Sequence, residues 1–548
     1  MKFKEVLLRE LKRRGIKYIF GVPGRENEQI LFNEVPEIEY ITTRIEFTAG
    51  IAADFSGRMT NKPQVCFSTM GPGATNMTTA VASAMLNKSP LIFFSAQLES
   101  DDNFYNITHQ CVNQTKIMEP LTKWSYEISH PQELPQVIEK AFKTALTEPV
   151  GPVHIAIPVD YFNEDIKVNY DIEKELIEEI ITPDLAIDEV EFNNFYKVVK
   201  EAKNPLILLG QEIFRVRAEE SIKEFIKTWN IPFIAAANAK GILDFDNPLN
   251  YGSASCYMEG ILKYNALDEI FGDVDLLICI GYQYVDDLLP KMWARGIEKK
   301  IITINSSALQ KVYKKFVPDI SIVTNIDRFF EEVNQVQPVR KNPKDLVELK
   351  EQYRLITQNP NQLEEGKLNT PQVINIINKY LDEGILITDI GYYRHHSIIL
   401  SNPSAPQRFF TDTGLSSFGV GLPSAIGAKI YNKDKKVFLI CGDGGFHSGS
   451  SELATLVKHN LPLIIVVLNN QRFELISLYQ DRSNEHGNKE IVDLAKIDFV
   501  KLAEANGCKG IKVHDVKSLE SAIDSYDSKN TLVIEVDVIY DENFKISF

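Results

Sequence analysis

The sequence predicts an α/β protein made of three doubly wound domains, each built on a parallel sheet. Short apolar, β-branched runs alternate along the chain with glycine-rich turns and helical patterns, which is typical of strands buried on both faces of such a sheet. The length of 548 residues corresponds to about three domains of usual size. Acidic or charged stretches interrupt the alternation twice, so we expect domains at residues 1–165, 188–335 and 368–548.

The first domain is predicted from a repeated order of strand, glycine-rich turn and helix. An amphipathic helix at residues 3–14 comes first, and a helix of small residues follows Glu46. The turn at residues 71–76, Gly-Pro-Gly-Ala-Thr-Asn, opens a further helix. The strands share a short apolar sequence bounded by turn residues and are predicted at residues 17–20, 39–43, 64–69, 90–96 and 152–158.

The second domain follows an acidic, irregular linker at residues 163–187. Its strands alternate with helical patterns in the same way, but no Gly-x-Gly-x-x-Gly sequence follows the first of them. A charged stretch at about residues 339–367 connects this domain to the third. The strands share apolar, β-branched sequences and are predicted at residues 205–210, 232–235, 275–280 and 300–304.

The third domain begins with a strand at residues 385–391 and contains a strand–helix–strand unit that we expect to form a ligand site. The strand at residues 436–441 ends in the sequence Gly-Asp-Gly-Gly around Asp443, a serine-capped helix follows at about residue 450, and the next strand ends in two asparagines. Because parallel strands end at the same edge of a sheet, Asp443 and the second asparagine, Asn470, are expected to lie side by side. Their oxygens, beside glycine N–H groups, suit Mg²⁺ bound to a diphosphate.

Charge and cysteine content argue against several classes of protein. The formal net charge of −16 argues against a nucleic-acid partner, because no basic stripe is available for phosphates. Six cysteines without paired spacing argue against a disulfide framework or a cysteine zinc site and favour a reducing cytoplasm. No apolar run approaches the roughly 20 residues that span a bilayer. We therefore expect a cytoplasmic protein that acts on small molecules, without a membrane partner.

The sequence resembles the cofactor signature of the thiamine-diphosphate (ThDP) enzymes, in which an aspartate flanked by glycines is followed by an asparagine. Here these residues are Asp443 and Asn470, which are 27 positions apart. Essentially the whole chain resembles the acetolactate synthase-like family, whose domains are pyrimidine-binding, central and diphosphate-binding. The resemblance implies ThDP and Mg²⁺, with the metal bound by Asp443, Asn470 and the backbone carbonyl of Arg472. It also implies a homodimer or homotetramer with active sites at the subunit interface. FAD, which acetolactate synthases carry, is not expected, because the second domain lacks the glycine fingerprint.

In this family a glutamate after the second strand meets the aminopyrimidine ring, and Glu46 matches it. By sharing a proton with ring N1′ it would help to activate the thiazolium carbon. Without the resemblance, Glu46 would be interpreted simply as a first-turn acid favoured by the helix dipole. Phe418, matched to the residue that holds the cofactor bent, would be interpreted as an ordinary core aromatic. The residues expected to contact the cofactor are Glu46, Gly73, Asn76, Ser417, Phe418, Gly442, Asp443, Gly444, Gly445, Asn470 and Leu475.

Within this branch, stretches such as residues 108–111, 391–395 and 442–448 resemble the carboxyethylarginine synthases more closely. That resemblance implies a transferase that joins a triose phosphate, glyceraldehyde 3-phosphate, to an amino-acid amine. Histidines suit proton transfer and an arginine fork suits phosphate, but a lone loop histidine is more often a solvated surface side chain. The implied catalytic residues are Glu46, His109, Gln110 and His395, and the implied substrate-binding residues are Arg394 and Tyr257.

Two alternatives to this transferase stay open. One is a pyruvate-decarboxylating carboligase like acetolactate synthase, which makes a C–C bond. The other is a catalytically silent ThDP-binding protein. Glu474 motivates the second alternative, because it places a carboxylate where family members have a glycine that backs the diphosphate.

Overall fold

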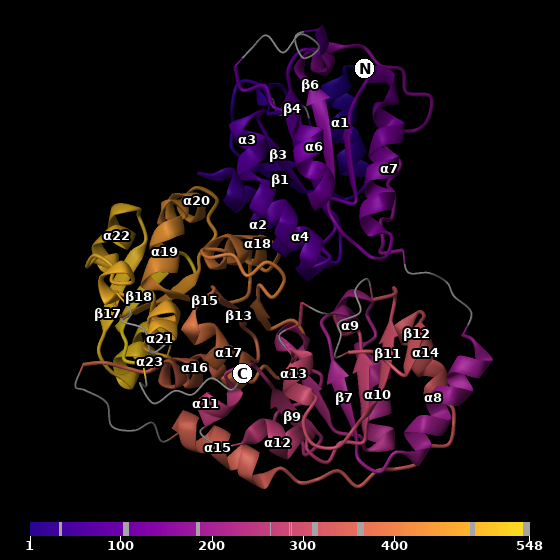
Figure 1. Ribbon diagram of the computed structural model, residues 1–548. Helices are drawn as coiled ribbons and strands as arrows, with labels where there is room; N and C mark the ends of the chain where they lie inside the picture. Colours follow the sequence, from indigo (N-terminus) through magenta and orange to yellow (C-terminus); the bar gives the residue numbers. More distant parts are fainter. Residues whose placement is uncertain are drawn as a thin grey trace. The chain divides into compact units, whose positions relative to one another are not determined.

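Three parallel six-stranded sheets, one after another along the chain, form the framework of the protein and confirm the predicted fold class (Figure 1). Helical connections join the strands, because a parallel pair needs a crossover rather than a tight hairpin. The residues that this computed structural model describes are 1–31, 35–101, 109–181, 187–262, 265–283, 285–286, 288–309, 316–358, 366–482 and 488–540.

The first sheet is flanked by two helical layers. Its strands are β1 (Tyr18–Gly21), β2 (Glu39–Thr42), β3 (Gln64–Ser68), β4 (Leu91–Gln97), β5 (Trp124–Glu127) and β6 (Val153–Pro158), in the order β2-β1-β3-β4-β6-β5. The helices are α1 (Phe3–Arg13), α2 (Glu46–Thr60), α3 (Pro72–Asn76), α4 (Thr78–Leu86), α6 (Gln114–Met118) and α7 (Leu134–Leu146). α1 packs with α7, and α2 packs with α4 (Figure 1). Five strands lie where the sequence predicts them. β5 escapes prediction because it is a half-buried edge strand without an apolar run.

The second sheet has the strand order of the Rossmann fold. Its strands are β7 (Pro205–Leu209), β8 (Phe233–Ala235), β9 (Asn250–Ser253), β10 (Leu276–Ile280), β11 (Lys300–Asn305) and β12 (Ile320–Val323), in the order β12-β11-β10-β7-β8-β9. Its main helices are α8 (Glu189–Glu201), α10 (Glu219–Trp229), α12 (Ala266–Phe271) and α14 (Ile326–Val333). The predicted charged connection also contains a helix, α15 (Val347–Gln358). That helix buries Leu349 and Tyr353, four residues apart on one face.

The third sheet repeats the strand order of the first. Its strands are β13 (Ile385–Thr388), β14 (Phe409–Thr411), β15 (Val437–Gly442), β16 (Ile464–Asn469), β17 (Lys509–Val513) and β18 (Leu532–Asp537), in the order β14-β13-β15-β16-β18-β17. The helices of this part are α16 (Thr370–Asn378), α17 (Tyr392–Leu400), α18 (Gly421–Tyr431), α19 (Asp443–Gly449), α20 (Leu453–Lys458), α21 (Glu474–Arg482), α22 (Phe499–Ala505) and α23 (Val516–Asp524).

The helix predicted at about residue 450 is present as α20, preceded by a short 3-10 turn at residues 450–452, but no serine side chain caps either element, so the predicted serine cap is wrong. An additional helix, α19, begins earlier, at Asp443. Glycines at positions 444 and 445 disfavour a helix by propensity, which hides this helix from sequence reasoning. In the structure Asp443 occupies its first turn, where the helix dipole stabilises a carboxylate. A Cβ atom at Gly444 would lie 2.6 Å from the ring of Phe473, a partly exposed side chain that would have to move to make room for it.

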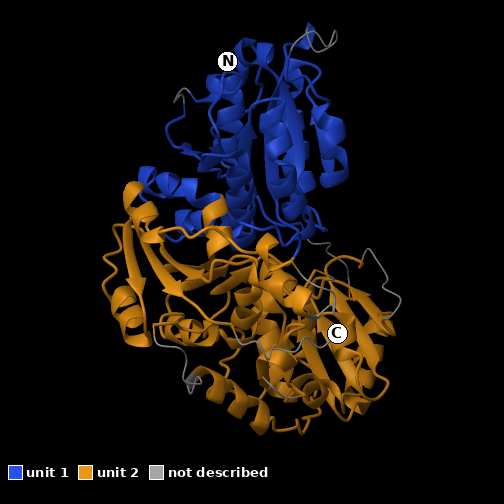
Figure 2. Cartoon of the chain, turned by 60° about the vertical axis from the view of Figure 1, so that its left-hand side comes forward, with its two compact units in different colours: residues 1–181, 414–433, 449–461 blue, residues 182–413, 434–448, 462–548 orange. Residues whose placement is uncertain are grey.

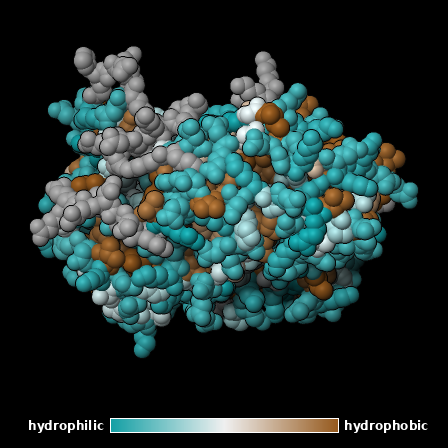
Figure 3. All heavy atoms as spheres, turned by 90° about the horizontal axis from the view of Figure 1, so that it is seen from below, coloured by the Kyte–Doolittle hydropathy of each residue, from teal (hydrophilic) through white to brown (hydrophobic). Residues whose placement is uncertain are grey.

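The chain divides into two compact units, coloured separately in Figure 2. Unit 1 comprises residues 1–181, 414–433 and 449–461, and unit 2 comprises residues 182–413, 434–448 and 462–548. The domain boundaries predicted from the sequence stay predictions. Among the described residues, no helix is long and apolar enough to cross a membrane. Figure 3 shows hydrophobic side chains as separate patches among hydrophilic ones on the face it presents.

Replacing Gly427 with alanine is expected to destabilise unit 1 by about 1–3 kcal/mol, the usual cost of overpacking a tight contact. Gly427 lies where α18 packs on α2, and a Cβ there would sit 2.4 Å from the backbone oxygen of Ala52. The matched control is Gly449→Ala, because no heavy atom lies within 4 Å of the Cβ position at Gly449. Thermal unfolding measures both variants, and equal midpoints would contradict the predicted clash.

Candidate functional site

The carboxyl ends of β15 and β16 bring Asp443 next to the turn that follows Asn470. The two strands pair in parallel, with Gly442 opposite Leu468. The backbone N–H of Gln471 donates to Asp443 Oδ2 over 2.6 Å, and the N–H of Gly444 donates to Oδ1 over 2.7 Å. The edge of the third sheet therefore holds a carboxylate, an amide and glycine N–H groups together, as the strand–helix–strand pattern predicts.

The surroundings of Asp443 favour a cation. Burial raises the pKa of this carboxyl, because the charged form loses solvent, although backbone N–H groups partly oppose that shift. The guanidinium of Arg472 does not neutralise it directly, since Arg472 Nε donates to Asp493 Oδ1 over 2.6 Å. A cation bound at Asp443 would compensate the buried negative charge.

The donor set at this edge fits Mg²⁺ that is shared with a diphosphate. Asp443, Asn470 and the carbonyl of Arg472 could supply three oxygen ligands, whereas Mg²⁺ takes six. In the part of the chain that the structure describes, no cluster of three or more His, Cys, Asp or Glu side chains could hold a metal by itself. The remaining ligands would come from a bound molecule and water. Leu475, the second residue of α21, packs against the hydrophobic core.

A second set of predicted residues lies in unit 1, where α2 begins at Glu46. The Nδ2 group of Asn76 donates to Glu46 Oε2 over 3.0 Å. The turn before Glu46 is held by Glu452, whose Oε1 accepts the N–H groups of Arg44 and Ile45 at 3.0 and 3.2 Å. Glu452 is fully buried, and burial raises its pKa. The sequence gives no reason to single it out, because it reads as an ordinary first-turn acid.

The turn that opens α3 brings the predicted residues Gly73 and Gln110 near the same helix end. A Cβ at Gly73 would lie 2.4 Å from Thr69 Oγ1, and one at Gly71 would lie 2.6 Å from the backbone oxygen of Gln110. His109 and Gln110 are exposed. Thr108, the first residue of this motif, lies outside the described residues.

The loop before α18 carries Ser417 and Phe418. Phe418 is 45% exposed, so the alternative that it is a core aromatic is wrong for this chain. The backbone turns sharply on both sides of this pair, with φ of 54° at Ser416 and 81° at Gly419. The exposure of Phe418 therefore places it at the surface of this chain rather than in the core.

A buried polar cluster in unit 2 contains the predicted residues His395 and Tyr257. His395 Nδ1 lies 2.8 Å from Ser255 Oγ, and its ring centroid lies 4.0 Å from that of Tyr257. The Tyr257 hydroxyl lies 2.5 Å from the hydroxyl of Tyr479, on α21. Burial, with the neighbouring charges of Arg394 and His396, holds the pKa of His395 well below its ordinary value. His395 is therefore a neutral imidazole near neutral pH.

The remaining predicted side chain on α17, Arg394, is buried rather than displayed. Its Nε donates to Thr411 Oγ1 over 2.9 Å, at the end of β14. Ser255 and Tyr479 are cluster members that the sequence does not identify. Their contacts with His395 and Tyr257 join positions far apart in the chain, so only the folded structure connects them.

The carboxyl end of the second sheet is filled by a carboxylate of the chain itself. Glu212 accepts the N–H of Ser306 over 2.8 Å and the side-chain N–H groups of Asn305 and Gln283. In Rossmann-type sheets this edge is where a dinucleotide phosphate binds. Glu212, which begins the helix after β7, therefore places a negative charge at the edge where such a phosphate would bind.

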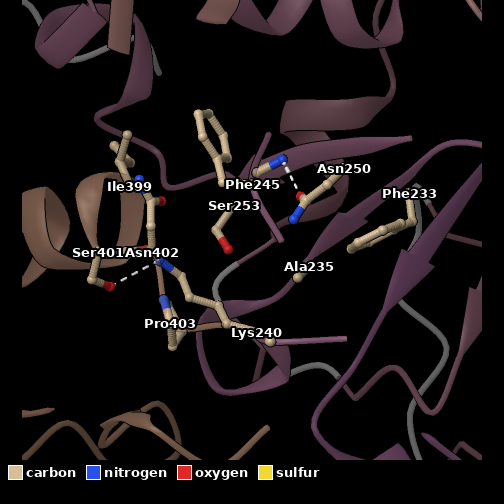
Figure 4. A pocket seen from close by; sticks show the side chains of 12 residues that line it. Phe233, Ala235, Lys240, Phe245, Asn250, Ser253, Ile399, Ser401, Asn402 and Pro403 are labelled. Atoms are coloured by element: carbon tan, nitrogen blue, oxygen red, sulfur yellow. Dashed lines mark hydrogen bonds between the residues drawn. The ribbon is translucent and has the colours of Figure 1, made fainter. Parts of the chain in front are cut away.

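A small pocket around Lys240 in unit 2 does not form a substrate site. Figure 4 shows the lysine side chain directed at Ser401, and Nζ donates to Ser401 Oγ over 3.0 Å. The cavity volume is about 20 Å³, which is room for about one water molecule. The buried Lys240 amine thus connects the loop after β8 to the end of α17 by a hydrogen bond.

Comparison with known proteins agrees with this arrangement. Three family models of the thiamine pyrophosphate enzymes match in succession: the N-terminal TPP binding domain at residues 1–117, the central domain at residues 193–333 and the C-terminal TPP binding domain at residues 389–536. Thiamine pyrophosphate is another name for ThDP. The N-terminal and C-terminal matches contain Glu46 and the Asp443–Asn470 edge respectively.

Similar proteins span nearly the whole chain. A probable acetolactate synthase large subunit from Methanocaldococcus jannaschii is 28% identical, over 94% of this chain and 88% of the relative. Acetolactate synthase from Bacillus subtilis is 25% identical, over 99% and 94%. The structure of a ThDP-dependent 4-hydroxybenzoylformate decarboxylase from Rhodococcus jostii RHA1 superimposes with a TM-score of 0.85 at 20% identity, over 99% of this chain and 100% of that one, which supports the fold. The chain therefore belongs to the thiamine-diphosphate-dependent enzymes, in their acetolactate synthase-like family.

Proposed function

We propose that the protein is a ThDP- and Mg²⁺-dependent carboligase that decarboxylates a 2-oxo acid such as pyruvate and forms a C–C bond. The observation that carries this proposal is the similarity to acetolactate synthases over nearly the full length of the chain. When bound, ThDP supplies a nucleophilic carbon and an electron sink for such substrates. The proposal replaces triose-phosphate transfer to an amine as the leading function, because the relatives described above are acetolactate synthases.

In this proposal Glu46 is the acid–base residue for the aminopyrimidine ring. Asn76 donates to Oε2 of Glu46, so the carboxylate is oriented and Oε1 is the oxygen proposed to share a proton with a ring nitrogen. Glu452 fixes the turn from which this side chain projects. Gly73, Ser417 and Phe418 are proposed to contact the cofactor from unit 1.

At the other end, the chain is proposed to bind the metal through Asp443, Asn470 and the Arg472 carbonyl. In the first turn of α19, the N–H group of Gly445 suits a diphosphate oxygen. For Gly444 to contact the diphosphate in the same way, its N–H would have to exchange its contact with Asp443 Oδ1. The remaining proposed cofactor contacts at this end are made by Gly442 and Leu475. By resemblance to the family, these two ends belong to active sites at the subunit interface of a homodimer or homotetramer.

The polar cluster on α17 supports a second candidate function, the carboxyethylarginine synthase-like transferase. His395 is buried, neutral and hydrogen-bonded to Ser255, so it can pass a proton, and Tyr257 lies against it. His109 and Gln110 are the further acid–base residues of this proposal, and Arg394 is its phosphate ligand. For Arg394 to take that role, its guanidinium would have to exchange the Thr411 contact for phosphate.

Two substrate mixtures separate these functions. Purified protein with ThDP and Mg²⁺ is incubated with pyruvate in one arm and with glyceraldehyde 3-phosphate plus arginine in the other. We expect CO₂ and an acetolactate-type product in the first arm. Phosphate release in the second arm without CO₂ in the first would favour the transferase. Turnover in neither arm, with deuterium exchange at the thiazolium carbon no faster than in solution, would overturn both.

A further inference from the structure

The side chain of Glu474 contacts the amide of Asn470. Asn470 Nδ2 donates a hydrogen bond of 2.8 Å to Glu474 Oε2. Glu474 is the first residue of α21 and is partly buried, so a helix rather than a free loop holds its carboxylate near the end of β16. The family pattern has glycine at this position, and glycine has no side chain that could make this contact.

This contact settles the orientation of the Asn470 side chain. A carboxamide carries its oxygen and its nitrogen on one carbon in one plane, so Nδ2 directed at Glu474 turns Oδ1 away from it. Only Oδ1 can bind a cation, because the NH₂ group is a donor. Arg472, whose charge also acts on Glu474, donates from Nε to Asp493 instead. The Glu474 carboxylate can therefore accept from the amide.

We propose that Glu474 is a positioning residue, which holds the Asn470 carboxamide with Oδ1 directed at the divalent cation. The inference rests on the proposed function, since it assumes a cation at Asp443 and Asn470. It also explains how a carboxylate is accommodated beside a diphosphate site, because its charge is engaged by an amide donor. Groups that orient metal ligands in this way typically change metal affinity by about 10- to 100-fold.

The test measures binding of Mn²⁺ to the full-length protein by electron paramagnetic resonance, with ThDP at saturation. Glu474→Ala removes the acceptor and is expected to weaken Mn²⁺ binding by about 10-fold or more. Glu474→Gln keeps an amide oxygen as acceptor and is expected to retain most of the affinity. Circular dichroism shows whether the variants keep their helical content.

A second background distinguishes orientation from charge. In Asn470→Asp protein, a carboxylate presents an oxygen whichever way it turns, so adding Glu474→Ala is expected to cause no further loss. An equal loss in both backgrounds, or no loss with Glu474→Ala alone, would overturn the inference. The proposed metal site is tested separately with Asp443→Ala. If Asp443→Ala leaves Mn²⁺ affinity intact, the proposed metal site is wrong. If Asp443→Ala lowers Mn²⁺ affinity but Glu474→Ala does not, only the positioning role of Glu474 is refuted.

Discussion

Turnover is expected to fall by at least about 10²-fold when Glu46 is replaced by glutamine, the usual scale for general acid–base catalysis. Glutamine keeps the length of the side chain and can still accept from Asn76 Nδ2, so the start of α2 should be preserved. What it cannot do is share a proton with the aminopyrimidine. Cofactor affinity, measured by calorimetry with Mg²⁺ present, is expected to stay close to that of the unsubstituted protein.

The matched control for this change is Glu189→Gln. Glu189 is likewise the first residue of a helix, α8, but it is exposed and belongs to unit 2. If glutamine at the start of a helix acted only through the helix dipole, both substitutions would have similar small effects. Turnover that is unchanged in Glu46→Gln would refute the acid–base role.

Replacing Asp443 with alanine is expected to weaken Mg²⁺-dependent binding of ThDP by at least about 100-fold, because it removes the only charged ligand proposed for the metal. The carboxylate also accepts the N–H groups of Gly444 and Gln471, so part of the loss reflects a less ordered turn. Calorimetric titration of ThDP at several Mg²⁺ concentrations measures the effect.

Asp515→Ala is the control for Asp443→Ala. Asp515 also belongs to unit 2 and also accepts a backbone N–H, from Ser518 at the start of α23, but it is exposed and lies outside the site. Its loss should lower stability without changing ThDP affinity. Equal ThDP affinities in the Asp443 and Asp515 variants would exclude Asp443 as a metal ligand.

The sequence predicts those parts of the structure that depend on local pattern. Buried strands such as β15 and β16 are read from apolar runs, and the adjacency of Asp443 and Asn470 follows from the rule that parallel strands end at one edge. Edge strands such as β5 and β12 are missed because one side of them faces solvent and their sequences are mixed. The helix beginning at Asp443 is missed because two glycines follow in its first turn, and glycine disfavours a helix by propensity.

Contacts between side chains far apart in the chain could not be predicted either, but for a different reason. The hydrogen bond between His395 and Ser255 joins residues 140 positions apart, and nothing in either local sequence specifies the other. The acceptor role of Glu452 is hidden in the same way, since its donors lie 407 and 408 positions earlier. The sequence therefore predicts at which edge of a sheet the site residues lie. It does not predict the distant side chains, such as Ser255 and Glu452, that hold parts of the site in position.

The crossover between β15 and β16 leaves unit 2 after Ser448, contributes Glu452 to unit 1, and returns at Pro462. A chimaera that exchanges this crossover for that of another family member would thus disturb the turn before Glu46, unless residues 43–46 were exchanged together with it. Substitutions in residues 43–46 and in the crossover should compensate one another. The crossover should also tolerate insertions poorly, although it lies far from α2 in the sequence.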